Sequence, residues 1–98
     1  PVLVDLWAPI CPHGPRVVRV VEQVAGDLAG QVKVVKVNVE GAPQLSRRFS
    51  VQASPTLLVV QQGRLLACRC GPAPAYKIRA WIEQVLIREQ ATAASPAD

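Results

Sequence analysis

The sequence is poor in aromatic residues, and this scarcity limits its functional classes. It contains two Trp, one Tyr and one Phe. Proteins that bind nucleic acid often combine clustered basic residues with stacking aromatic side chains. Here the only adjacent basic pair is Arg47-Arg48. We therefore interpret the net charge of +4 as a basic, solvent-exposed surface and expect no nucleic-acid partner.

Long hydrophobic runs are also missing. Charged residues such as Asp5, Lys36 and Arg64 interrupt the apolar stretches, and none reaches the roughly 18 residues that a membrane-spanning helix needs. No signal-peptide pattern is visible, although the chain opens with Pro1 rather than Met. We expect a soluble, cytoplasmic protein with no membrane partner.

Cysteine is scarce and its count is odd, with Cys11, Cys68 and Cys70 as the only three. An odd number in a short chain argues against the disulfide framework of a small secreted domain. These cysteines and the single histidine, His13, do not show a recognisable spacing of metal ligands. We expect no metal and no other cofactor.

The sequence is rich in apolar residues, which make up half of it and are dominated by valine. A chain of this length and composition can bury the core of one domain. We predict that residues 1–87 form this domain and that residues 88–98, which end in small and polar residues with a proline, form a disordered tail.

Residue patterns predict seven elements in the order strand, helix, strand, helix, strand, strand, helix. They cover residues 2–8, 16–28, 32–39, 43–49, 56–60, 64–70 and 78–86. A helix between the first two strands predicts a parallel pair with a right-handed crossover. The turn Gln61-Gln62-Gly63 predicts an antiparallel hairpin. The expected fold class is α/β, with a four-stranded mixed sheet flanked by helices.

Several segments in this order resemble the thioredoxin family. The resemblance covers residues 1–87 and rests on the strand Val-Leu-Val-Asp-Leu-Trp-Ala-Pro at 2–9, Lys-Val-Asn-Val-Glu at 36–40, Ser54-Pro55-Thr56, Gly63 and Gly71. It implies a thioredoxin fold in a minimal βαβαββα form, because the family's first strand and helix do not precede Val2 in this sequence.

The redox motif departs from the family's Cys-x-x-Cys, because this sequence reads Cys11-Pro12-His13-Gly14. Cys11 occupies the position of the nucleophile, ahead of a predicted helix whose N-terminus favours a thiolate. His13 can add positive charge there. Ile10 replaces the tryptophan usual in the family. A lone thiolate can form a mixed disulfide, but the thiol that normally releases the substrate is missing at Gly14.

The resemblance implies roles for further residues. Asp5 corresponds to the family's buried proton acceptor, and Lys36 to a lysine close to it. Pro55, after Ser54, corresponds to a cis proline that shapes a peptide-binding groove beside Cys11.

Around that groove, the resemblance adds Ile10, Pro12 and Gly71 as candidate substrate-binding residues. Cys70 is either a resolving thiol near the rim of the site or a thiol packed in the core. We expect Trp7 and Trp81 to be core residues.

The C-terminal half resembles the thioredoxin domain of bacterial chaperedoxins, at Gly71-Pro72-Ala73-Pro74, Ile78-Arg79-Ala80 and residues 85–89. These holdases carry helical repeats after that domain, and no repeats follow here. The leading hypothesis is a thioredoxin-like protein that engages protein thiols or unfolded clients through one cysteine, with monothiol or weak redox activity. Glutathione or a thiol reductase is a further candidate partner. A true protein-disulfide reductase and a redox-inactive adaptor are the alternatives.

Overall fold

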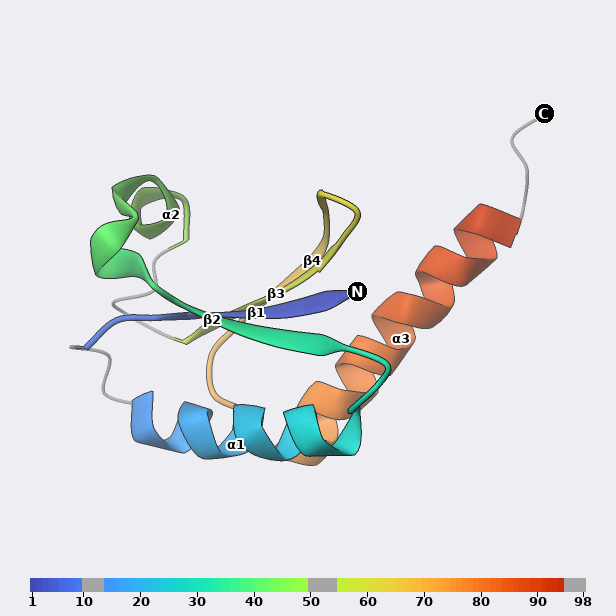
Figure 1. The fold of residues 1–98 in the computed structure, drawn as a ribbon, viewed down its shortest axis with the longest axis horizontal. Coiled ribbons are helices and arrows are strands. Elements are labelled where there is room, and N and C mark those ends of the chain that lie inside the picture. The colour runs from blue at the N-terminus through green and yellow to red at the C-terminus, as the bar shows by residue number, and fades with distance from the viewer. Residues whose placement is uncertain (10–13, 50–54, 95–98) are drawn as a thin grey trace.

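The computed structural model describes residues 1–9, 14–49 and 55–94. Its elements follow the predicted order, with one short 3-10 helix added (Figure 1). They are β1 (Val2–Trp7), α1 (Gly14–Asp27), β2 (Lys33–Asn38), η1 (Val39–Gly41), α2 (Pro43–Arg48), β3 (Thr56–Gln61), β4 (Arg64–Cys70) and α3 (Ala75–Ala94).

The four strands form one mixed sheet in the order β2-β1-β3-β4. β1 and β2 are parallel, with Asp5 opposite Lys36. β3 runs antiparallel to both β1 and β4. The predicted α/β class, the four-stranded mixed sheet and the hairpin are therefore confirmed.

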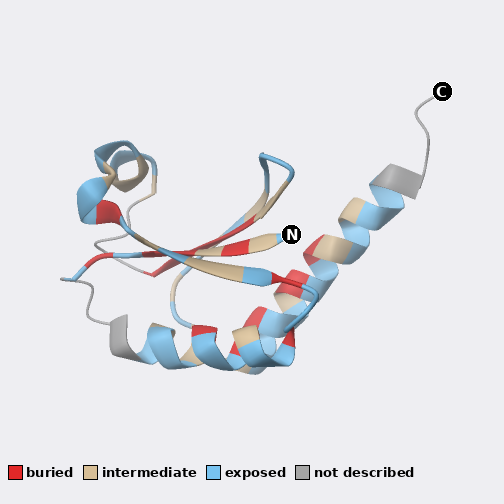
Figure 2. Ribbon diagram, viewed as in Figure 1, coloured by how far each residue is buried: buried red, intermediate tan, exposed pale blue. Residues whose placement is uncertain are grey.

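The larger hydrophobic core lies between the sheet and the helices α1 and α3, which cover the same face (Figure 1). Alternate strand residues such as Leu3, Leu57 and Val59 point to this face, because side chains along a strand alternate between faces. The helices contribute Val21, Val24, Leu28, Ile78, Ile82 and Val85. Buried residues therefore follow the strands and the helix sides that face them (Figure 2).

A smaller core lies on the opposite face, under α2. Its buried members are Leu6, Ala8, Val39 and Leu58. Leu45 of α2 and Phe49, the residue that ends this helix, pack against them. These contacts involve β1, η1 and β3, so the outer strand β4 receives little cover on this face.

The hairpin between β3 and β4 turns at Gln62 and Gly63, whose φ angles are 52° and 76°. Two successive residues with positive φ form the tight turn whose twist suits an antiparallel pair. The register shifts between Val59 and Val60, which pair with Ala67 and Leu65, so Leu66 of β4 is the extra residue of a bulge. The glycine predicted at this turn is thus placed where the backbone requires it.

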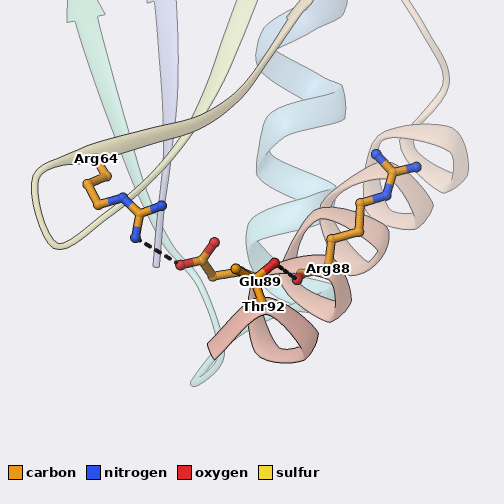
Figure 3. Close-up of polar contacts among 4 residues, drawn as sticks. All are labelled: Arg64, Arg88, Glu89 and Thr92. Carbon is orange, nitrogen blue, oxygen red and sulfur yellow. Dashed lines mark hydrogen bonds and ion pairs between the residues drawn. The ribbon is translucent and has the colours of Figure 1, made fainter. Parts of the chain in front are cut away.

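The helix α3 continues to Ala94, into the region for which the sequence predicted a tail. Residues 88–94 contain strong helix formers and neither Gly nor Pro, so nothing local ends the helix there. Glu89 accepts a hydrogen bond from Arg64 at 3.3 Å, and the Thr92 hydroxyl donates to the Arg88 carbonyl at 3.0 Å (Figure 3). The domain boundary at residue 87 stays a prediction.

In the part of the chain that the structure describes, no helix has the length and apolar character needed to cross a membrane.

Candidate functional site

An apolar pocket opens where β1 ends and α1 begins. Its volume is about 640 Å³. The described residues that line it are Asp5, Leu6, Trp7, Ala8, Pro9, Val17, Val18, Lys36, Asn38 and Pro55. The walls therefore come from β1, α1, β2 and the start of β3, which are brought together only by the fold.

Asp5 is a charged residue in the centre of the sheet, and it faces this pocket. It is 1% exposed, and its Oδ1 has no hydrogen-bond partner in the structure. Burial raises the pKa of the Asp5 carboxyl above its usual range, while the positive charge of Lys36 lowers it by a smaller amount. A carboxyl in this setting holds a proton more readily than an exposed one.

Lys36 lies directly across from Asp5 in the parallel pair of strands. Its ion pair is with Glu22 of α1, at 3.8 Å between Nζ and Oε1, and both side chains are substantially exposed. The lysine therefore influences Asp5 through its charge, while its ammonium group lies toward solvent.

Pro55 and Gly71 lie side by side at one end of the hairpin strands. The Gly71 N–H donates to the Pro55 carbonyl at 2.9 Å. Gly71 has a φ of +94°, a conformation that residues with a side chain rarely adopt. Both residues line a second, smaller cavity with Val17 and Val20 of α1. Pro55 thus separates the two cavities at the first turns of α1.

Cys68 and Cys70 are free thiols on the edge strand, and both are exposed. They face the α2 side of the sheet, since they lie opposite Leu58 and Thr56. The Cys70 sulfur is 4.0 Å from the Thr56 hydroxyl. The expectation of a core thiol at Cys70 is wrong, because α2 packs on β1, η1 and β3 and leaves this edge open.

The prediction that Trp7 belongs to the core is also wrong, since it is 37% exposed and lines the pocket. Trp81 does pack against the larger core. The position of Trp7 in β1 indicates this difference in burial. Trp7 lies on the same sheet face as Asp5, but it is the last residue of the strand. The nearby Val18 of α1 is also exposed, at 38%.

The remaining predicted site residues are Ile10, Cys11, Pro12, His13 and Ser54, and they lie outside the described residues. The peptide bond between Ser54 and Pro55 includes one of them, so the predicted cis proline stays a prediction. Residues 10–13 belong to the connection 8–13 between the end of β1 and Gly14, the first residue of α1. Among the described residues, no three His, Cys, Asp or Glu side chains form a group that could hold a metal ion.

Comparisons with known proteins agree with this geometry. Residues 1–84 match the family model described as Thioredoxin. The chain is 34% identical over 84 residues to thioredoxin of Haemophilus influenzae, which covers 86% of this chain and 78% of that protein. It is 35% identical over 86 residues to thioredoxin 1 of Nostoc sp., covering 88% and 80%.

Solved structures show the same fold. One is thioredoxin-2 of a malaria parasite, described as a component of the parasite's protein secretion machinery. It superposes with a TM-score of 0.73 at 18% identity, covering 85% of this chain and 81% of that one. A second malarial protein has a TM-score of 0.73 at 19% identity, covering 87% and 96%. Because residues 1–84 match the family model and relatives of 34% and 35% identity cover most of the chain, this chain belongs to the thioredoxin family.

Proposed function

We propose that this protein engages protein thiols and disulfides through Cys11 as a single nucleophile, and that client peptides bind in the pocket beside Pro55. The observation that carries the proposal is the pocket itself. It lies between the end of β1 and the first turns of α1, the two elements that residues 10–13 connect. Family membership supports protein thiols and disulfides as the kind of partner.

The proposed reaction is one thiol–disulfide exchange. The Cys11 thiolate attacks one sulfur of a client disulfide, forms a mixed disulfide with it and expels the other client sulfur as a thiolate. Gly14 carries no thiol to attack this intermediate. Turnover then needs an external thiolate, such as glutathione or a thiol reductase, that attacks the client sulfur and returns Cys11 as a thiolate.

Other residues serve this step through position and charge. Asp5, buried and unpartnered at Oδ1, is the proposed acceptor of the proton that the Cys11 thiol gives up to become a thiolate, and Lys36 opposite it tunes that carboxyl. His13 adds positive charge near Cys11 when protonated.

The proposed client-binding residues surround this chemistry. They are Ile10, Pro12, Ser54, Pro55 and Gly71. Of these, Pro55 and Gly71 meet through a backbone hydrogen bond.

Cys70 offers an internal alternative for releasing the client. It lies opposite Thr56, next to Pro55, at the end of the sheet that borders the pocket. If its thiol reached the mixed disulfide, the protein would work as a complete disulfide reductase. Replacement of Cys70 by Ser would then abolish turnover without external glutathione.

A trapping experiment tests the single-thiol mechanism. The protein is incubated with a peptide whose cysteine carries a good thiol leaving group, and the products are measured by intact mass. We expect a peptide on Cys11 that is stable until glutathione is added, and Cys11→Ser should lose only this adduct. Peptide mapping distinguishes it from peptide on the exposed thiols Cys68 and Cys70. Spontaneous release of the peptide by wild type would contradict the proposal, and Cys70→Ser would then identify the resolving thiol.

Restoring the second thiol of the redox motif is the complementary test, because it should increase the rate of disulfide reduction. The variant Gly14→Cys recreates the family's Cys-x-x-Cys spacing. We expect it to reduce insulin disulfides at least about 10-fold faster than wild type, because an attached thiol acts at a high effective concentration. Equal rates for the two proteins would show that Gly14 does not limit turnover.

A second candidate function is the holding of unfolded clients, as in chaperedoxins. The exposed side chains of Trp7 and Val18 at the pocket favour it, because apolar contact needs no thiol. Suppression of client aggregation that survives in Cys11→Ser but is lost in Trp7→Ala would support this function. Both candidate functions suit the cytoplasm, where thiols stay reduced.

A further inference from the structure

We propose that Cys68 and Cys70 form a two-thiol site for a soft monovalent metal ion, copper(I), on the edge strand β4. This site does not use Cys11 or the pocket beside Pro55, so it goes beyond the proposed function.

The position of the two thiols on the strand carries the inference. They are separated by one residue, so both project from the same face of β4. Both are exposed. β4 is an edge strand, and no strand of the described residues pairs with its outer side.

Strand geometry favours a bridging ion over a direct disulfide. Residues two apart on a strand are separated by about 6.5 Å. A disulfide brings its sulfurs to about 2.0 Å and prefers Cα atoms about 5.5–6 Å apart. Two metal–sulfur bonds of about 2.3 Å each span about 4.6 Å when they are collinear. An ion therefore bridges the thiols with little change in the strand, whereas this separation is near the upper limit of about 6.8 Å for a disulfide.

Binding exchanges the two thiol protons for the ion. Binding breaks two S–H bonds, forms two Cu–S bonds and releases two protons, and no electron is transferred. The resulting site, one Cu⁺ and two thiolates, carries one net negative charge. The Thr56 hydroxyl lies 4.0 Å from the Cys70 sulfur.

The number of ligands selects the ion. Thiolates bind soft ions, chiefly copper(I) and zinc. Structural zinc requires four ligands in a tetrahedron. In the described part of the chain, no third Cys, His, Asp or Glu joins this pair in a metal-binding group. Two sulfurs satisfy copper(I), which accepts low coordination numbers, but leave zinc incomplete.

The test is an anaerobic titration with copper(I) in competition with bicinchoninate. It is carried out on the full chain carrying Cys11→Ser, so that the third thiol does not contribute. We expect one copper(I) per chain to transfer from the competitor. Adding Cys68→Ser or Cys70→Ser should each weaken binding by about 100-fold or more, because one thiolate alone no longer chelates the ion.

Both exposed positions tolerate serine, so circular dichroism and a thermal melt are expected to match those of the parent variant. X-ray absorption at the copper edge should show two sulfur neighbours. The proposal is overturned by failure to take copper(I) from the competitor, by unchanged affinity in either single variant, by nitrogen or oxygen neighbours, or by one copper(I) shared between two chains.

Discussion

At the residue scale, Asp5 is the side chain whose setting is hardest to reconcile with stability. Its carboxyl is buried in the centre of the sheet, and one oxygen has no hydrogen-bond partner. A buried, unpartnered polar group costs folding free energy, and a charged one costs more. A side chain that lowers stability and faces a pocket is typical of functional positions.

The variant Asp5→Asn is therefore expected to be more stable than wild type at pH 7, by about 1–3 kcal/mol in the free energy of unfolding. The raised pKa means that the folded state binds the proton more tightly than the unfolded state. Wild-type stability from this group thus falls as pH rises from the unfolded pKa through the folded one. Urea unfolding at several pH values measures the difference.

The advantage of Asp5→Asn should shrink as the pH is lowered, because the raised pKa favours the protonated carboxyl in the folded state. The exposed Glu83 provides the control, since Glu83→Gln removes a carboxylate that is not buried. A difference between Asp5→Asn and wild type that stays constant from pH 7 to pH 4 would show that charge burial is not its cause.

The sequence predicted the surroundings of a residue best where they follow from the alternation of side chains along a strand. It placed Asp5 in a buried strand, and it placed Cys68 and Cys70 on one face. It was wrong about Trp7 and about burial at Cys70. Burial of these residues depends on how far a helix reaches over the sheet, and the short helix α2 is not long enough to cover β4. The pattern of residues along a strand does not show how far a neighbouring helix extends over the sheet.

At the element scale, valine-rich strands and helical spacing identified every strand and α-helix, because burial on one or two faces leaves a period in the sequence. The 3-10 helix η1 at Val39–Gly41 was not predicted. Three residues are too few to show a period, and Val39 continues the apolar pattern of β2. Asn38 begins η1 by accepting a hydrogen bond from the Glu40 N–H at 3.0 Å.

The substitutions Gly71→Ala and Gly26→Ala are expected to change stability in opposite directions. Gly71 follows β4 with a φ of +94°, so Gly71→Ala forces a side chain into a strained backbone conformation. We expect it to lower the free energy of unfolding by about 1–3 kcal/mol. Gly26 lies in α1 with open space around it, so Gly26→Ala should raise stability by about 0.5–1 kcal/mol.

Chemical denaturation of both variants measures the two effects under the same conditions. A Gly71→Ala protein as stable as wild type would mean that the hydrogen bond from Gly71 to Pro55 tolerates another backbone conformation. A destabilised Gly26→Ala protein would mean that this end of α1 is packed more closely than the structure shows.

At the scale of the whole molecule, the pocket combines residues from the start and middle of the chain, and α3 closes the larger core from the far end. The family resemblance predicted the fold correctly, because the segments occur in the right order and spacing. The limit of the domain is harder to infer. A helix can continue past its last core contact when its sequence contains good helix formers.

Truncation after Ile87 tests whether the domain ends there. The core contacts of α3 include Ile82, Val85 and Leu86, all of which remain in the truncated chain. The main tertiary interaction that the described structure gives to residues 88–94 is the ion pair between Glu89 and Arg64, and Arg64 is 69% exposed. An ion pair of this kind contributes less than about 1 kcal/mol.

We therefore expect truncation to lower the free energy of unfolding by less than about 1 kcal/mol. Glu89→Ala in the full chain should account for most of this loss, and the loss should decrease at high salt because ions screen exposed charges. A loss of several kcal/mol, with Glu89→Ala unaffected, would contradict the boundary at residue 87. The last turns of α3 would then belong to the folded unit, and the domain would extend to Ala94.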